Sequence, residues 1–317
     1  MRELTINKND AGQRLDKFLS KKFKTMPKSL MYKYIRIKCI KLNGKKCNID
    51  DVLKENDVLT FYIKDEFFDI KPKSYDFMKA PVKLSIVYED ENILLLDKPQ
   101  GLLVHPDKDY HFDSLIARVK HYLYDKGEYN PEEENSFSPA TVNRIDRNTG
   151  GIVIAAKNSD ALKTLNLLMK ERKIEKYYLC LCEGIFTKKE GLVESGLKKN
   201  EKSNTVTKVK IGAEDSKESA TKYKVIDEKN NLSLVECQLL TGRTHQIRVH
   251  MSSLRHPLAG DTKYGGKEFR KHGNVGQALY SYKLRFTGCK DTIMEYLEGK
   301  EFEVKNIWFA KNGQISI

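Results

Sequence analysis

The sequence lacks the features that mark membrane proteins, secreted proteins and acidic proteins. No stretch approaches the ~20 continuous apolar residues of a membrane-spanning helix, and the first ten residues, MRELTINKND, hold no apolar signal core. Aspartate and glutamate number 44 against 57 lysines and arginines, so the net charge of +13 excludes a solvating acidic protein. We therefore expect a soluble protein of the cytoplasm.

Cysteine and histidine are present but not in metal-binding patterns. The six cysteines form no C-x-x-C pair, and a chain of 317 residues does not need disulfides for stability. Cys180 and Cys182 stand two apart, which places both on one face of a strand. The intervals between His245, His250 and His256 fit neither H-E-x-x-H nor a zinc finger. We predict reduced thiols and no metal site.

The residues that are present suffice for a folded protein of more than one domain. Hydrophobic residues make up 39% of the chain, and at ~150 residues per domain its 317 residues predict two domains. Positive charge is concentrated at the start, because residues 1–65 hold 16 lysines and arginines against 8 acidic residues, a net +8. This excess favours a polyanionic partner, although a solvated, lysine-rich surface without a role has the same composition.

Two short amphipathic helices are expected in this basic segment. Leu15, Phe18 and Leu19 recur at helical spacing. A second helix, which Ser29 is expected to cap, would expose Lys33 and Arg36. Strands at 39–42 and 58–63, the first followed by the hairpin signal Asn-Gly, would complete the unit. Such a unit can present cations to an RNA backbone.

The basic segment resembles a known RNA-binding domain. The letters G-x-R-L-D-K-F-L at 12–19, I-R at 35–36 and L-N-G-K at 42–45 look like the small domain first known from ribosomal small-subunit protein S-four. The resemblance implies RNA contacts by Arg14, Lys33 and Arg36. That domain usually has a glycine after its second helix, where this chain has Lys38 or a neighbour. We expect this domain at 1–65, a linker at 66–81 and a second domain at 82–317.

Three segments of the second domain could hold chemistry. The first, DKPQGLLVHP, follows strands expected at 84–88 and 93–97, and by itself indicates only a turn. In the second, NRIDRNTGG, Arg144 and Arg147 flank Asp146 before an expected strand at 152–156. A carboxylate between guanidinium groups stays ionised, which suits a nucleophile, but a structural ion pair at a strand entrance has the same pattern.

The third segment, TGRTHQIRVHM, follows a strand expected at 234–240. Its arginines, Arg243 and Arg248, and the later Arg255 suit phosphate binding or the orientation of a carboxylate, because a guanidinium fork matches either group.

Taken together, the segments resemble the RluA-type family of pseudouridine synthases. The letters N-R-I-D-R-N-T-G-G are similar to the family signature H-R-L-D-x-x-T-S-G, and T-G-R-T-H-Q-I-R-V-H-M, continuing to H-P-L-A-G-D, is close to its last motif. I-E-K-Y-Y-L-C-L-C-E-G at 174–184 resembles the strand that supplies a tyrosine, and S-A-T-K-Y at 219–223 fits a further motif. The match runs in order from Val82 to Phe286. Asn143 and Gly150 depart from the signature, where the family has histidine and serine.

The resemblance implies isomerisation of uridine in RNA without a cofactor. Asp146 matches the catalytic aspartate, Arg248 the arginine that pairs with it, and Tyr178 the tyrosine that stacks on the base. Arg144 matches a position used in base flipping, and Ile247 a residue that packs against the flipped uracil. Whether the nucleophile attacks the base or the sugar stays open.

The family also implies an α+β fold, with a mixed, mainly antiparallel sheet flanked by helices. Recurrent strand-like runs and a helical pattern at 160–169 are compatible with it. The leading hypothesis is a monomeric enzyme that modifies large-subunit ribosomal RNA. The alternatives are a transfer RNA synthase, or a ribosome assembly factor that binds RNA without reacting.

Overall fold

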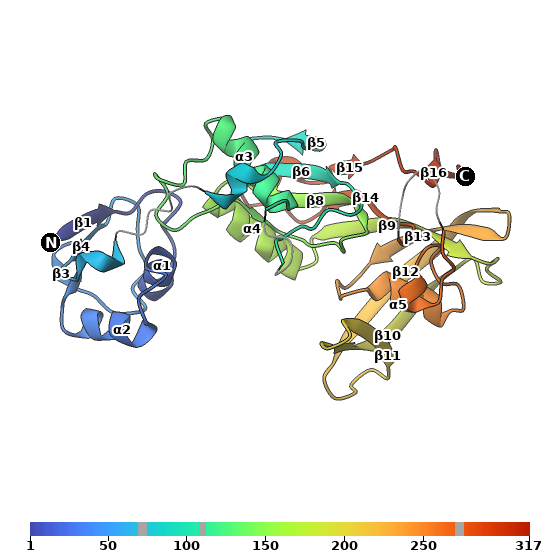
Figure 1. Cartoon of the computed structure of the whole chain (residues 1–317), viewed down its shortest axis with the longest axis horizontal. Coiled ribbons are helices and arrows are strands. Elements are labelled where there is room, and N and C mark those ends of the chain that lie inside the picture. Colours follow the sequence, from blue (N-terminus) through green and yellow to red (C-terminus); the bar gives the residue numbers. More distant parts are fainter. Residues whose placement is uncertain (69–74, 108–111, 270–275) are drawn as a thin grey trace.

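The computed structural model describes residues 1–68, 75–107, 112–269 and 276–317. A small N-terminal unit and a larger C-terminal unit follow one another along the long axis of the molecule (Figure 1). Within the described chain, no helix is both long and apolar enough to cross a membrane.

The N-terminal unit packs two helices against a small sheet. Its elements are β1 (Arg2–Thr5), α1 (Leu15–Lys22), α2 (Lys28–Arg36), β2 (Ile40–Leu42), β3 (Lys45–Lys46) and β4 (Val58–Phe61), with strand order β1-β4-β2-β3. Its buried cluster draws on residues up to Phe61, with the partly buried Phe67 and Phe68 packed against it.

One local prediction in this unit is wrong. Pro27, not Ser29, stands at the N-cap of α2, and no side chain caps that helix. The chain reverses after α2 at Lys38, which has a φ of 64° and so takes the left-handed conformation that usually favours glycine.

The predicted linker, 66–81, contains only short 3₁₀ turns in its described part. These are η1 (Asp65–Phe67), which begins just before it, and η2 (Asp76–Lys79). Residues 69–74 lie outside the described residues.

The C-terminal unit is built on a long, mixed sheet, which confirms the α+β prediction. Its path is β11-β10-β12-β13-β9-β14-β8-β6-β5, with β7 beside β8 and β15 beside β14. The strands are β5 (Ile86–Glu89), β6 (Ile93–Lys98), β7 (Ala140–Thr141), β8 (Gly150–Ala156), β9 (Ile174–Glu183), β10 (Glu190–Asn200), β11 (Thr205–Val209), β12 (Ser216–Lys229), β13 (Leu232–Leu239), β14 (Leu279–Phe286) and β15 (Glu301–Glu303). Among the described pairings, β8 with β14 is parallel.

Helices cover both faces of this sheet. Ser114 caps α3 (Leu115–Asp125), and Asn158 caps α4 (Ser159–Lys170), each by accepting a bond from a backbone N–H of the first turn. The apolar side chains of α4 belong to one buried cluster. The cluster on the other face contains most apolar side chains of α3, together with Ile247 and Met251 of α5 (Gln246–Ser253).

The C-terminal tail completes the sheet only in part. β15 pairs with β14, whereas β16 (Ala310–Lys311) and β17 (Gln314–Ile315) form a separate two-stranded hairpin. Trp308 is partly buried and packs against the main core.

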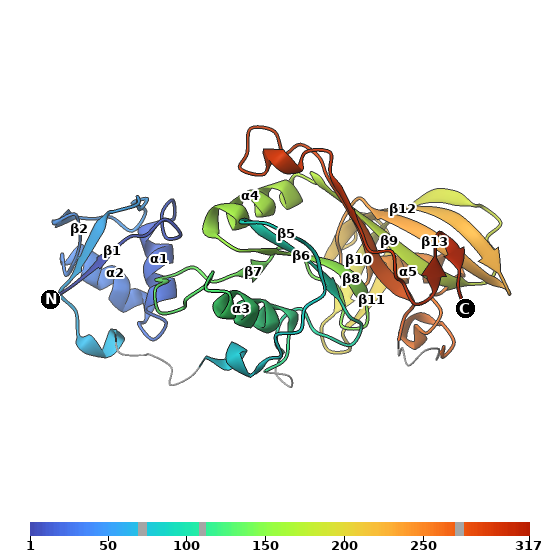
Figure 2. The ribbon, with the colours of Figure 1, turned by 90° about the horizontal axis from the view of Figure 1, so that it is seen from above.

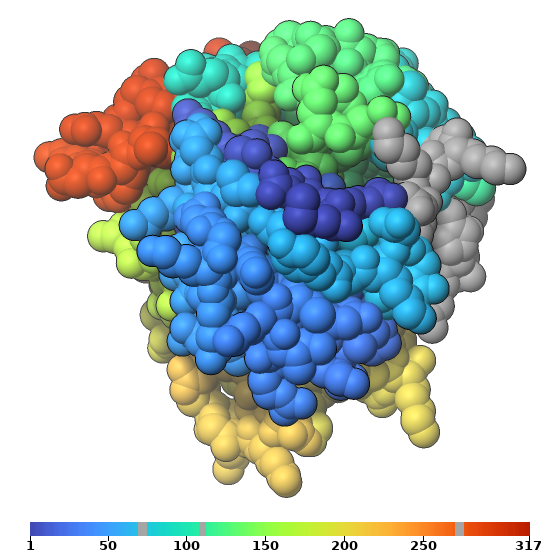
Figure 3. All heavy atoms as spheres, turned by 90° about the vertical axis from the view of Figure 1, so that its left-hand side faces the viewer, coloured from blue at the N-terminus to red at the C-terminus, as the bar shows by residue number. Residues whose placement is uncertain are grey.

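A polar interface joins the two units. The fully buried Asp10 accepts hydrogen bonds from Ser136 Oγ (2.7 Å) and Asn135 Nδ2 (2.8 Å). Lys22 Nζ donates to Asn135 Oδ1 (3.0 Å), and Lys163 Nζ on α4 donates to the Ala11 carbonyl (2.8 Å). Figure 2 shows α1 on the side of the N-terminal unit that faces the C-terminal unit, and Figure 3 shows green atoms of the larger unit bordering the blue N-terminal unit.

Candidate active site

A cleft of about 850 Å³ opens on the face of the sheet that carries α3 and α5. It brings together residues that are more than 140 positions apart in the sequence. The five residues predicted for the catalytic domain all line it: Arg144, Asp146, Tyr178, Ile247 and Arg248.

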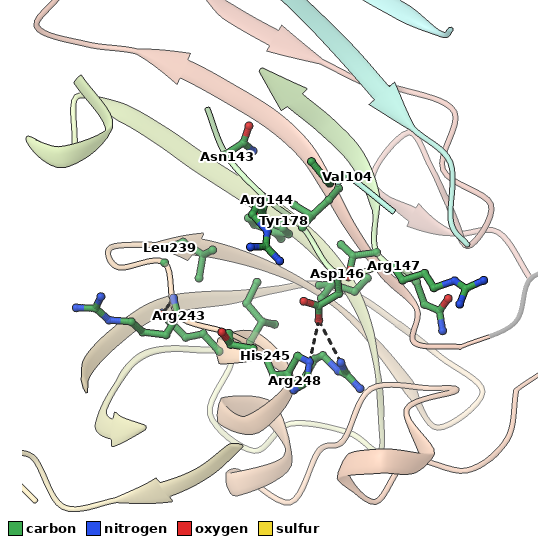
Figure 4. A pocket seen from close by; sticks show the side chains of 18 of the residues that line it. Val104, Asn143, Arg144, Asp146, Arg147, Tyr178, Leu239, Arg243, His245 and Arg248 are labelled. Carbon is green, nitrogen blue, oxygen red and sulfur yellow. Dashed lines mark hydrogen bonds and ion pairs between the residues drawn. The ribbon is translucent and has the colours of Figure 1, made fainter. Parts of the chain in front are cut away.

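Asp146 lies in the loop that leads into β8, at the centre of the cleft (Figure 4). Its Oδ2 accepts a hydrogen bond from Arg248 Nη1 (3.1 Å) and lies 3.7 Å from His245 Nε2. The side chain keeps 29% of its surface exposed, so a substrate can reach the carboxylate.

Arg248 is fixed on α5 by a second carboxylate. Its Nε and Nη2 donate to Asp261 Oδ2 and Oδ1, both at 2.7 Å, in a two-pronged ion pair. Burial opposes the positive charge, but these bonds and the charge of Asp146 prevail and raise the pKa of Arg248. The guanidinium is therefore a fixed cation that bridges Asp146 and Asp261.

Tyr178 lies on β9 in the wall of the cleft, opposite Cys237 of β13 and Ser281 of β14. Its side chain is buried, and burial raises the pKa of its phenol to about 12, with the charge of Asp146 adding to the effect. The phenol is therefore neutral at physiological pH. A neutral aromatic ring beside a carboxylate suits contact with a planar base.

Lys98 connects the first motif to the Asp146 loop. The side chain is fully buried, and its Nζ donates to the carbonyls of Pro99 (2.9 Å), Leu102 (2.7 Å) and Arg147 (3.0 Å). Burial lowers the pKa of this ammonium to about 7. The D-K-P-Q-G segment, which the sequence alone indicated only as a turn, thus supports the loop that carries Asp146.

Known proteins with similar sequences decide the family. Residues 92–253 match the RNA pseudouridylate synthase family. An uncharacterized RNA pseudouridine synthase of Mycoplasma capricolum subsp. capricolum is 34% identical over 98% of this chain and 100% of its own length. The ribosomal large subunit pseudouridine synthase C of Vibrio vulnificus is 33% identical over 89% of this chain and 87% of its own length.

The chain belongs to the RNA pseudouridylate synthase family. It is therefore an RNA pseudouridine synthase, an isomerase, as the RluA-type motifs predicted. The solved structure of human RNA pseudouridylate synthase domain containing 1 is similar, with a TM-score of 0.55 and 25% identity over 75% of this chain and 86% of that one.

The two departures from the family signature have structural reasons in this pseudouridine synthase. Asn143 is buried and its side chain hydrogen-bonds to the backbone of β8. Its Oδ1 accepts from the Ile154 N–H (2.8 Å), and its Nδ2 donates to the Ile152 carbonyl (3.3 Å). A Cβ at Gly150 would overlap the ring of Tyr280 on β14. Gly150 is therefore a point of close approach inside the sheet, not a source of loop freedom.

The arginines that flank Asp146 in the sequence do not both point toward it. Arg147 Nε donates to the Gly101 carbonyl (3.0 Å), and Figure 4 shows its side chain directed away from Asp146. Arg144 is exposed and lines the same pocket as Tyr178. The guanidinium that holds Asp146 comes from Arg248, 102 residues further along the chain.

Two residues near Asp146 have roles that the sequence reasoning missed. Asp261 binds Arg248, but in the sequence it had no role beyond being the last residue of the motif H-P-L-A-G-D. His245 was considered for metal binding, but it precedes α5 in the left-handed conformation (φ 55°), and its Nδ1 lies 2.6 Å from the Tyr264 hydroxyl. Burial lowers the pKa of His245, with the cation Arg248 also contributing and Asp146 opposing.

The residues predicted for the N-terminal unit lie outside the cleft. Lys33 and Arg36 are exposed on α2, and Arg14 pairs with Asp16 at 3.1 Å. Within the described ranges, no group of three or more His, Cys, Asp or Glu residues is arranged to hold a metal ion.

Proposed function

We propose that this RNA pseudouridine synthase modifies uridines of large-subunit ribosomal RNA and that Asp146 is its nucleophile. The observation that carries the proposal is the chain of charges Asp146–Arg248–Asp261, which holds one partly exposed carboxylate at the centre of the cleft. The ribosomal target rests on the name of the Vibrio relative and on the basic N-terminal unit.

The reaction breaks the bond between N1 of uracil and C1′ of ribose and forms a bond between C5 and C1′. Arg248 orients the Asp146 carboxylate, which attacks either the base or the sugar and is released again by the time the product leaves. C5 then loses its proton to solvent and N1 takes up a proton, so that the product is an isomer of uridine. Because the Tyr178 phenol is neutral with a pKa of about 12, the structure supports stacking on uracil as its first role.

The target uridine must leave its stack before Asp146 can reach it. Unstacking a base costs a few kcal/mol and is easiest in loops and bulges. In this proposal Arg144, exposed at the cleft, contacts the opened RNA, and Ile247, buried in its floor, packs against the flipped uracil.

The N-terminal unit is the proposed RNA anchor, as an S-four-like domain at 1–65. Arg14, Lys33 and Arg36 are its proposed contacts. Cations of this kind position an RNA by its phosphates without reading its sequence.

Tritium release tests the proposal. Large-subunit ribosomal RNA labelled at C5 of uridine is incubated with wild type, Asp146→Asn and the control Asp291→Asn, which makes the same change at an exposed loop position. We expect release by wild type and the control and none by Asp146→Asn, with RNA binding retained.

Parallel reactions with labelled transfer RNA at equal salt identify the substrate class. Release from transfer RNA alone would contradict the ribosomal target. Binding of ribosomal RNA without release from either RNA would support a ribosome assembly factor instead.

A further inference from the structure

His245 lies between Asp146 and a tyrosine. Its side chain lines the cleft and is only 8% exposed. Its Nε2 lies 3.7 Å from Asp146 Oδ2, and its Nδ1 lies 2.6 Å from the hydroxyl of Tyr264 in the 3₁₀ turn η3 (Thr262–Tyr264). The two ring nitrogens therefore face different groups, and the position of the ring hydrogen decides what each nitrogen can do.

The bonds of Tyr264 determine which nitrogen carries that hydrogen. The backbone N–H of Val206 on β11 donates to the Tyr264 hydroxyl oxygen at 2.9 Å. In the described part of the chain this hydroxyl has one other partner, Nδ1 of His245, and it donates its single hydrogen there. The opposite arrangement would leave the hydroxyl hydrogen without an acceptor in the same residues. Nδ1 is therefore the acceptor, and Nε2 carries the hydrogen of the neutral ring.

The surroundings of His245 keep its ring neutral. Burial lowers the pKa of the imidazole. The nearby carboxylates Asp146 and Asp261 oppose this effect, whereas the nearby cations Arg248 and Lys263 add to it. At physiological pH the ring is therefore neutral and has one N–H, on the nitrogen that faces Asp146.

Tyr264 is itself held in place. Its ring lies under Arg248, whose guanidinium carbon is 4.9 Å from the ring centroid. The ring also packs against a small buried cluster with side chains from β10, β11 and α5. The β10–β11 hairpin therefore supports both groups that approach Asp146, which are Arg248 and His245 (Figure 4).

The two groups act on the same oxygen of Asp146. Arg248 Nη1 donates to Oδ2 at 3.1 Å, and Nε2 of His245 faces this oxygen as well. Oδ1 has no hydrogen bond or ion pair with any group in the described part of the chain. The distance of 3.7 Å exceeds that of a hydrogen bond, but catalytic hydrogen bonds are often long in a free enzyme and shorten when the substrate fills the site.

We infer that His245 is a positioning residue for Asp146, whose Nε2–H, directed by Tyr264, binds Oδ2 in the RNA complex and leaves Oδ1 as the attacking oxygen. The inference rests on the proposed function, because it takes Asp146 to be the nucleophile. Two donors on Oδ2 restrict rotation of the carboxylate and so keep Oδ1 directed at the uridine.

The position of the ring hydrogen can be read by NMR. In a protein with isotope-labelled histidine, the correlation of ring nitrogens with ring carbon-bound protons separates the two neutral tautomers. The chain has seven histidines, and the signal of His245 is the one lost in His245→Asn. At pH 8 we expect the hydrogen on Nε2 in wild type and a mixture of tautomers in Tyr264→Phe. A hydrogen on Nδ1 in wild type would overturn the inference.

The effect of the directed N–H on the reaction is tested by His245→Asn. Asparagine readily adopts the left-handed conformation of this position, and its Oδ1 can still accept from Tyr264, but it lacks an N–H that reaches Asp146. We expect single-turnover tritium release from large-subunit ribosomal RNA to slow about 10- to 100-fold, the range known for groups that orient the ligands of a metal site, with RNA affinity unchanged. A rate equal to that of wild type would refute the positioning role.

A conservative variant separates this role from a structural one. His245→Gln places an amide N–H near the position of Nε2, so we expect it to retain more activity than His245→Asn. A purely structural role predicts the reverse order, because asparagine suits the φ of 55° better than glutamine does.

Tyr264→Phe keeps the ring under Arg248 and removes the hydroxyl. We expect a slower rate, and little further loss in the double variant with His245→Asn, because both changes act on the same hydrogen. The matched control is Tyr296→Phe, which removes a hydroxyl that donates to Asp90 Oδ2 (2.7 Å) outside the cleft. Its rate should equal that of wild type, and an equal loss in both tyrosine variants would count against the inference.

The two readouts separate this inference from the proposed function. Tritium release that is as fast in His245→Asn as in wild type rejects the role of His245 alone. Absence of release from wild type, with the ring hydrogen found on Nε2, rejects the proposed reaction alone, because the tautomer is read without RNA.

Discussion

His250 is the buried polar residue on which the position of α5 depends. Its Nε2 lies 3.0 Å from both Ser195 Oγ and Ser219 Oγ, and its Nδ1 lies 2.9 Å from Thr221 Oγ1. These partners belong to β10 and β12, so the imidazole joins the helix that carries Arg248 to the sheet. Burial lowers the pKa of His250 to about 4, and the charge of Lys208 adds to the effect.

This imidazole makes the stability of the fold depend on pH. The unfolded chain binds a proton at His250 near pH 6.5, whereas the folded chain does so only near pH 4. The contribution of His250 to the free energy of unfolding is therefore complete above pH 6.5 and is lost as the pH falls toward 4. We expect urea unfolding to show wild-type stability falling by up to ~3 kcal/mol over this window from His250, and His250→Gln to show a shallower fall.

The comparison between pH 8 and 9 is the control, because His250 is neutral there in both states. A variant whose stability falls as steeply as that of wild type between pH 6.5 and 4 would show that other groups produce the effect.

At the residue scale, the sequence predicted the identities of Asp146, Tyr178 and Arg248 and their meeting in one cleft. Ordered motifs carried that prediction, and their catalytic roles remain proposals. The pairing of Arg248 with Asp261 was not predictable from spacing, because it depends on how the chain returns after α5. Arg147 was expected beside Asp146, but the turn directs its Nε to the Gly101 carbonyl.

At the scale of elements, β8 and β14 can lie close together because Gly150 has no side chain. Gly150 leaves room for the ring of Tyr280, whose hydroxyl donates to Asp97 Oδ1 on β6 (2.6 Å). Gly151, beside it, has a φ of 110° and lies against the backbone of Ser281. The glycine pair thus allows the close approach of the strand that follows the Asp146 loop.

We expect Gly150→Ser, which restores the usual family letter, to destabilise this chain. Overpacking in a core typically costs about 1–3 kcal/mol, and each kcal/mol lowers the melting temperature by about 2–4 °C in a domain of 150–250 residues. In a Tyr280→Ala background the serine has room, so its added cost should be much smaller. Thermal unfolding of the two single variants and the double variant measures this coupling, and additive effects would show that the Tyr280 ring is not the obstacle.

Helices and strands with a clear hydrophobic periodicity were predictable from the sequence, whereas elements defined by contacts with distant segments were not. The strand expected at 93–97 is β6 (93–98), and the helix expected at 160–169 is α4 (159–170). The strands β10, β11 and β12 and the helix α5 were not predicted. In the strands, burial of a side chain depends on segments elsewhere in the fold, so the sequence lacks a regular hydrophobic alternation. The helix α5 is buried on most of its faces, so it lacks the polar face of an amphipathic helix.

At the scale of the whole molecule, a net charge of +13 acts together with two docked units. A protein that makes 6–10 phosphate contacts loses about 10³- to 10⁵-fold in affinity for nucleic acid between 50 and 200 mM salt. We expect RNA affinity to fall in this range, while the rate at saturating RNA changes little, because Arg248 and Asp261 are buried and poorly screened. Filter binding and single-turnover tritium release over a salt series measure the two quantities, and an equal fall of both would contradict this separation.

Docking of the units was beyond prediction from the sequence. The stretch around Asn135 and Ser136 is polar and acidic without a hydrophobic period, and Asp10 is one acidic residue in a basic segment. Only the folded chain shows that Asn135 and Ser136 donate hydrogen bonds to the buried Asp10, since bonds between residues about 125 positions apart leave no local pattern.

The parallel pairing of β8 with β14 also has a consequence for the order of folding during synthesis. Tyr280 and Ser281 stand opposite Gly150 and Gly151, about 130 residues earlier in the chain. Contacts between such distant segments close late and slowly in folding. Gln277 and Leu279, at the start of β14, line the same cleft as Asp146, so we expect a nascent chain that lacks β14 to have an incomplete cleft and no activity.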